Sequence, residues 1–67
     1  MQVYDIAMYE LTYEEALQTV QAGKQVLVYC TFYKSFLKIV TTESALEEVG
    51  RGMLSVIGSI HYLRYFT

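Results

Sequence analysis

The sequence predicts a single α+β domain, in which a small antiparallel sheet carries one or two helices on one of its faces. Three observations lead to this fold class. The chain has 67 residues, which is enough for one domain, residues 1–67. Segments rich in β-branched and aromatic residues alternate with segments that carry helix-capping signals. There is no proline, repeat or low-complexity tract that would mark a linker.

The first strand is expected at residues 3–9, and a helix follows it. Thr12 and Glu15 have the spacing of a capping box. In this motif the Thr hydroxyl accepts a hydrogen bond from the amide three residues later, and the Glu side chain accepts one from the Thr amide. Apolar residues then recur at helical spacing. Gly23 supplies the left-handed residue that commonly ends a helix.

Residues 25–33 and 36–41 read as a β-hairpin interrupted by Lys34 and Ser35. A loop of two residues and a loop of four residues both place Phe32 opposite Leu37. Both therefore put the same side chains on each face of the hairpin, which we call the same register parity. The expected core face then holds Val26, Val28, Cys30, Phe32, Leu37 and Ile39. The opposite face holds Leu27, Tyr29, Thr31, Tyr33, Phe36, Lys38 and Val40.

A short second helix is expected at residues 42–49, with Ser44 and Glu47 as a further capping box. The glycines of residues 50–52 are expected to end it. Residues 53–66 read as strand-like, with Gly58 and Ser59 forming either a turn or a bulge. The resulting order, β-α-β-β-α-β(β), is compatible with a ferredoxin-like, split βαβ arrangement.

Apolar residues make up 54% of the chain, including seven tyrosines and three phenylalanines. So small a domain buries only about 60% of the surface that its unfolded chain exposes. Some apolar material is therefore expected outside, on the second face of the hairpin, where tyrosine is typical of interfaces. The candidate partner-binding residues are Tyr29, Tyr33, Lys34, Phe36 and Lys38. The alternative is that these aromatics only pack across strands and contact no partner.

Catalytic chemistry finds little support in the residue types present. His61 is the single histidine and Cys30 the single cysteine, and the expected register buries the thiol. A Cys30–His61 pair is the one catalytic alternative, and an inert buried thiol is far commoner. Paired metal-ligand spacing and a complete phosphate-binding glycine pattern are both missing. We therefore expect no enzyme, no metal and no cofactor.

The formal net charge of −2 is too small for a DNA mimic and has the wrong sign for a protein that binds phosphates. One unpaired cysteine is typical of a reducing cytosol. The first residues show neither a basic start nor an apolar run, so no secretory signal is expected. The longest apolar stretch, residues 53–63, is too short and too interrupted to span a membrane. We expect a cytoplasmic protein without a membrane partner.

Residues 11–17 read Leu-Thr-Tyr-Glu-Glu-Ala-Leu, and residues 23–26 read Gly-Lys-Gln-Val. This pattern resembles the opening of short bacteriophage proteins, in particular the Thoeris anti-defence 2 type, whose members sequester a nucleotide signal. Residues 28–31 depart from that type, which has a basic residue and a tryptophan there, so no ligand site is carried over. The resemblance implies a phage or mobile-element accessory protein that acts in a bacterial host.

Together these observations favour a small inhibitor that blocks a bacterial protein by direct contact, with a defence component as the expected target. Two alternatives stay open. The same aromatic face could join copies of the chain into a homo-oligomer that holds a small ligand. It could also stack single-stranded nucleic acid, although the acidic balance disfavours this.

Overall fold

A computed structural model describes residues 9–67 and confirms the α+β class. In chain order the elements are β1 (Glu10–Leu11), α1 (Tyr13–Gln21), β2 (Val26–Cys30), β3 (Ser35–Val40), α2 (Glu43–Ile57) and β4 (Leu63–Phe66). The strand expected at residues 3–9 falls outside the described residues except for Tyr9. Tyr9 exchanges two backbone hydrogen bonds with Thr67, of 3.1 and 3.0 Å, which continue the β1–β4 ladder.

The four strands form one antiparallel sheet in the order β1-β4-β2-β3. Strand β4 lies between β1 and β2, which α1 connects, and β2 lies between β3 and β4, which α2 connects. The chain therefore contains two split βαβ units, as expected. The strand order nevertheless differs from the ferredoxin-like arrangement. Here β2 and β4 are the two central strands, whereas in the ferredoxin-like order the first and third strands are central.

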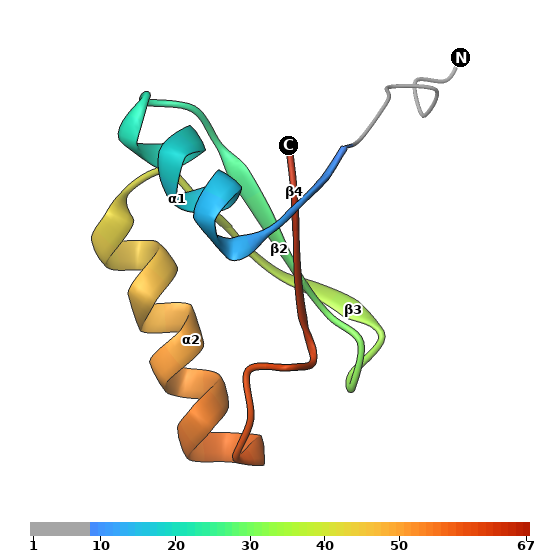
Figure 1. Ribbon diagram of the computed structural model, residues 1–67. Helices are drawn as coiled ribbons and strands as arrows, with labels where there is room; N and C mark the ends of the chain where they lie inside the picture. Colours follow the sequence, from blue (N-terminus) through green and yellow to red (C-terminus); the bar gives the residue numbers. More distant parts are fainter. Residues whose placement is uncertain (1–8) are drawn as a thin grey trace.

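Both helices cover the same side of the sheet (Figure 1), and the core lies between the two layers. Alternate residues of β2 and β4 point into it, together with the last residue of β3 and residues from both helices. The buried set is Ala16, Val20, Val26, Val28, Cys30, Val40, Leu46, Leu63 and Tyr65.

Helix α1 forms where its local signals predict. Thr12 Oγ1 accepts from the Glu15 amide at 3.1 Å, and the Thr12 amide donates to Glu15 Oε1 at 2.9 Å, so the capping box is complete. At the other end Gly23 has φ +83°. The Gly23 amide donates to the Val20 carbonyl and the Lys24 amide to the Thr19 carbonyl, which is the Schellman pattern.

Helix α2 is longer than predicted, because residues 50–52 do not end it. It begins after Thr42, whose hydroxyl accepts from the Ala45 amide at 3.1 Å, and it ends at Gly58 with φ +75°. The reason is tertiary packing: the continuous helix buries an apolar stripe that recurs every four residues and outweighs the low helix propensity of two glycines. That stripe consists of Ala45, Val49, Met53 and Ile57.

The expected strand at residues 53–66 is correspondingly wrong over its first half. Residues 53–57 are helical, and only Leu63–Phe66 is a strand. Gly58 is the left-handed cap of α2 and is neither a hairpin turn nor a bulge.

The hairpin register also differs from the prediction. Strand β2 ends at Cys30, which pairs with Ser35, and residues 31–34 form the loop, with Lys34 at φ +56°. A bulge then reverses the parity, because Val28 pairs with Lys38 while its neighbour Tyr29 pairs with Phe36. An extra residue in one strand reverses which side chains share a face, and no residue type announces it.

Beyond the bulge Lys38, Ile39 and Val40 change face relative to the prediction, and Phe32 differs as well because it lies in the loop. Val40 pairs with Val26 and is buried, whereas Ile39 pairs with Leu27 on the other side and is 57% exposed. Phe32 lies in the loop and is 54% exposed, so it does not belong to the core.

Candidate functional site

The side of the sheet turned away from the helices carries a row of apolar side chains. Phe66 of β4 pairs with Leu27 of β2, which pairs with Ile39 of β3. In the next row Tyr29 pairs with Phe36 on one side and with Arg64 on the other. We call this surface the open sheet face and define it by five apolar residues: Leu27, Tyr29, Phe36, Ile39 and Phe66.

Within residues 9–67, no helix or strand covers the open sheet face (Figure 1). Ile39 and Phe36 are the most exposed of the five, Phe36 at 50%. Leu27, Tyr29 and Phe66 are half-buried by their neighbours. A contiguous apolar surface of this kind is uncommon on a monomer unless it takes part in binding.

The aromatic rings of the open sheet face hold one another in place. The ring centroids of Tyr29 and Phe36 are 5.0 Å apart at 72°, and those of Phe36 and Phe66 are 6.2 Å apart at 70°. Both are edge-to-face arrangements, which aromatic pairs favour. Rings that already pack in the free protein lose little side-chain entropy when a partner covers them.

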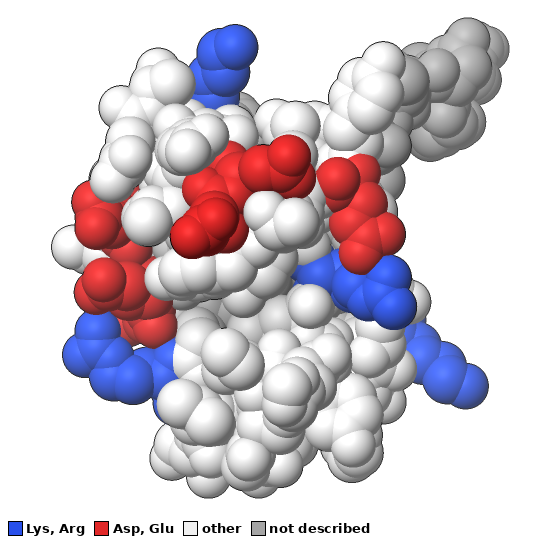
Figure 2. All heavy atoms as spheres, in the orientation of Figure 1, with Lys and Arg blue, Asp and Glu red and all other residues white. Residues whose placement is uncertain are grey.

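One exposed ion pair borders the open sheet face. Arg64 Nη1 lies 2.8 Å from Glu10 Oε2, from the neighbouring strand β1. The pair leaves this border close to neutral. Figure 2 shows the other acidic side chains of residues 9–67 gathered around the helices, while the lower part of the view is almost free of charge.

The predicted partner-binding residues separate into three groups. Tyr29 and Phe36 lie together on the open sheet face as expected. Tyr33 and Lys34 lie in the β2–β3 loop, beyond the end of the sheet. Lys38 pairs with the core residue Val28 and so lies on the helix-covered side, at the exposed edge strand, which corrects its expected face.

The sequence does not predict Ile39 and Phe66 as members of this face. Its predicted register places Ile39 in the core, because it does not include the bulge. Phe66 could have been identified from the alternation of β4, because buried Leu63 and Tyr65 imply that Arg64 and Phe66 face the other way.

A second aromatic group lies at the loop end of the hairpin. The Phe32 ring is 5.2 Å from that of Tyr33 and 5.3 Å from that of Tyr62, both edge-to-face. The Thr31 amide and hydroxyl both donate to the Tyr62 carbonyl, at 2.8 and 3.1 Å, and tie the loop to the chain before β4. We call Phe32, Tyr33 and Tyr62 the aromatic tip.

The two groups considered for catalysis differ in burial. Cys30 is completely buried in the core, whereas His61 is exposed in the loop before β4. No three His, Cys, Asp or Glu side chains within residues 9–67 gather in a way that could hold a metal ion. Neither helix of this part of the chain is long and apolar enough to cross a membrane.

Comparison of the chain with protein-family models, with curated proteins and with solved structures finds no match. A functional proposal therefore rests on the fold and its surfaces. They define a small α+β domain with one apolar sheet face that its own helices leave uncovered.

Proposed function

We propose that this protein is a non-catalytic binding protein that docks its open sheet face on another protein. The observation that carries the proposal is the distribution of the two layers. Both helices lie on one side of the sheet, and five apolar side chains are presented on the other. Covering such a face removes apolar area from water, which favours association by about 25 cal/mol for each Å².

Two residues are the expected anchors of the interface. Phe36 contacts both Tyr29 and Phe66, so it lies at the centre of the aromatic group, and Ile39 is the most exposed aliphatic member of the face. Large side chains near the centre of an interface usually contribute most of the binding energy.

The partner surface should be apolar and weakly charged. The pairing places two charged side chains on this side of the sheet, Arg64 beside Tyr29 and Glu10 beside Phe66, and their ion pair neutralises both. Binding of nucleic acid would require unpaired cationic side chains on this face to contact the phosphate groups. The face therefore suits a protein partner better than a nucleic acid. The resemblance of residues 11–26 makes a bacterial defence protein the first partner to test, with this chain as its phage-encoded inhibitor in the host cytoplasm.

The test compares three versions of the protein as bait in a bacterial lysate. Phe36→Ala alters the open sheet face, and Val56→Ala is the matched control, because Val56 is 64% exposed and lies on α2 on the other side of the sheet. A genuine partner is retained by the wild type and the control and is lost with Phe36→Ala.

Titration calorimetry with the purified partner then gives the magnitude. Phe36→Ala is expected to weaken binding by about 2 kcal/mol, or roughly 30-fold, if Phe36 is an anchor. Equal affinity of Phe36→Ala and Val56→Ala, with both variants folded, would rule out the open sheet face as the contact surface. Sedimentation of the wild type at rising concentration identifies the other possible occupant, a second copy of this chain.

A further inference from the structure

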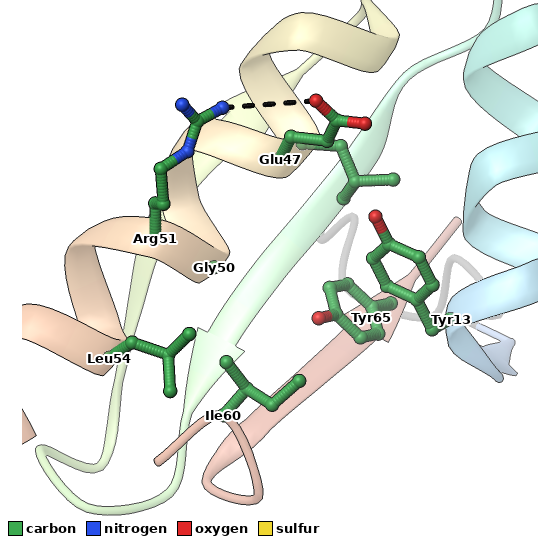
Figure 3. A pocket seen from close by; sticks show the side chains of 8 residues that line it. Tyr13, Glu47, Gly50, Arg51, Leu54, Ile60 and Tyr65 are labelled. Carbon is green, nitrogen blue, oxygen red and sulfur yellow. Dashed lines mark ion pairs between the residues drawn. The ribbon is translucent and has the colours of Figure 1, made fainter. Parts of the chain in front are cut away.

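The loop end of the molecule carries a second group of exposed apolar side chains, apart from the open sheet face. Leu54, near the end of α2, and Ile60, in the following loop, line one open pocket of about 260 Å³, and Figure 3 shows them side by side. The Leu63 amide donates to the Ile60 carbonyl at 3.1 Å, which closes a turn that also holds Tyr62. Leu54 and Ile60 therefore adjoin the aromatic tip.

We call this combined surface the apolar end and define it as the aromatic tip together with Leu54 and Ile60. Each of its five side chains is between 39% and 54% exposed. Residues 31–37 and 52–63 contain a single Lys, Arg, Asp or Glu, which is Lys34 at the border of the tip. The ends of α2 and of the hairpin lie in the lower part of Figure 1, which in Figure 2 is almost free of charge.

The area of the apolar end is close to what a weak dimer needs. A large apolar side chain has roughly 200 Å² of surface, so five that are about half exposed present on the order of 500 Å². Two copies that meet through this surface would bury on the order of 1,000 Å² together, which is the lower limit for a specific interface.

Composition and charge favour a second copy of the chain as the partner. Interfaces between identical subunits are more apolar than transient interfaces and are depleted in charged residues, as the apolar end is. Two copies that meet there keep the acidic side chains of their helices apart (Figure 2), whereas contact through the helix layer would bring Glu43 and Glu47 of the two copies together. A lipid surface would favour several cations around the apolar residues, and the apolar end has only Lys34 within these segments.

We propose that the chain forms a two-fold dimer through the apolar end. In such a contact the same surface is used by both copies, so each of its residues is present twice. The open sheet face is the flat side of the sheet, whereas the apolar end lies at the loop end of the hairpin. The dimer therefore leaves both open sheet faces accessible, and the inference does not depend on the proposed function.

Sedimentation velocity of the full chain from about 1 to 500 µM tests the proposal. A reversible monomer–dimer equilibrium is expected, with a Kd of the order of 10–100 µM because interfaces of this size are weak. Leu54→Glu places an unpaired charge in the interface twice and should raise the Kd more than about 10-fold.

Val56→Glu is the matched control for Leu54→Glu. It adds the same charge to the same helix, so the long-range repulsion between two copies is equal in the two variants. Val56 is 64% exposed and points to the other side of α2, because two residues correspond to a rotation of roughly 200° around a helix. Its Kd should stay within about 2-fold of the wild type, as for other exposed charges outside an interface.

Two variants outside α2 complete the comparison. Phe32→Ala removes the ring that contacts both Tyr33 and Tyr62 and should raise the Kd by about 10-fold. Ile39→Ala alters the open sheet face and should leave the Kd unchanged. Circular dichroism should show all four variants folded, because each replaces an exposed side chain.

Three results would overturn the proposal. The first is a wild type that is monomeric at about 500 µM, well above the expected Kd. The second is equal association of Leu54→Glu and Val56→Glu. The third is loss of the dimer in Ile39→Ala, which would place the second copy on the open sheet face.

Phospholipid vesicles test the remaining occupant of the apolar end. A monomeric chain that sediments with vesicles of phosphatidylcholine and phosphatidylglycerol, and loses this binding in Leu54→Glu, would assign the apolar end to lipid and overturn the dimer. Partner capture depends on Phe36→Ala and dimerisation on Leu54→Glu, so the failure of one proposal is distinguishable from the failure of the other.

Discussion

The glycines of α2 and its cap give a prediction whose sign depends on the structure. Gly52 lies inside the helix, has no positive φ, and would place a Cβ where nothing lies within 4 Å. Alanine at a helix-interior position is favoured over glycine by about 0.5–1 kcal/mol. Gly52→Ala should therefore increase the free energy of unfolding by about that amount.

Gly58 provides the contrasting case on the same helix. Its φ of +75° is a left-handed conformation, which a Cβ makes unfavourable by roughly 1–2 kcal/mol. Gly58→Ala also restricts the unfolded chain, which offsets part of this loss, so a net destabilisation of about 1 kcal/mol is expected. Gly58→Asn should lose less, because asparagine tolerates the left-handed cap.

Thermal unfolding followed by circular dichroism measures both effects. In a domain of this size 1 kcal/mol shifts Tm by about 4–8 °C, so Gly52→Ala should raise Tm by about 2–8 °C and Gly58→Ala should lower it. If residues 50–52 broke the helix, as the sequence suggests, Gly52→Ala would lower Tm and would not increase the helical signal. That result would refute the continuous α2.

Three further variants test individual interactions. Thr12→Ala removes the capping box with Glu15 and should destabilise the fold by about 1 kcal/mol in urea unfolding; no change would mean that the cap is absent in solution. Because burial raises the pKa of Tyr65, its stabilising effect is present below its unfolded pKa of about 10 and is lost as pH rises through the folded pKa. Stability should fall above pH ~10, and Tyr65→Phe should reduce that fall; an unchanged slope would contradict the assignment. Arg64→Ala should lower stability by less than about 1 kcal/mol at low salt and by less still in high salt, since its pair with Glu10 is exposed. A large, salt-independent loss would show another role for Arg64.

The sequence predicts best where local chemistry decides the structure. Helix α1 follows from Thr12, Glu15 and Gly23, because each contributes a hydrogen bond or conformation within one turn of the helix end. The α+β class and the element order also follow from such local patterns.

The full length of α2 can be predicted only from the apolar pattern that spans residues 45–57. Two glycines in three residues favour a break, but Val49 and Met53 lie one turn apart and pack on the core on both sides of them. Attention to the four-residue repeat across Gly50 would have predicted the continuous helix. Here packing over the full length outweighs two unfavourable local preferences.

The candidate site was predicted in part. Tyr29 and Phe36 were placed together correctly, because near the loop the predicted and observed pairings share the same parity. Beyond the bulge the parity reverses, which moves Lys38 off the face and Ile39 onto it. A bulge depends on how the whole hairpin fits the core, so the residue types within it do not specify it.

The central claim is that the open sheet face is an accessible apolar surface. Methyl NMR with a soluble nitroxide tests it directly, because Ile39 and Val28 lie on opposite sides of the same sheet, the first 57% exposed and the second fully buried. Strong broadening of the Ile39 methyl groups with little effect on those of Val28, in a dilute monomer, is the predicted result. Equal protection of the two residues at every concentration would contradict the account, because the face would then have no room for a partner.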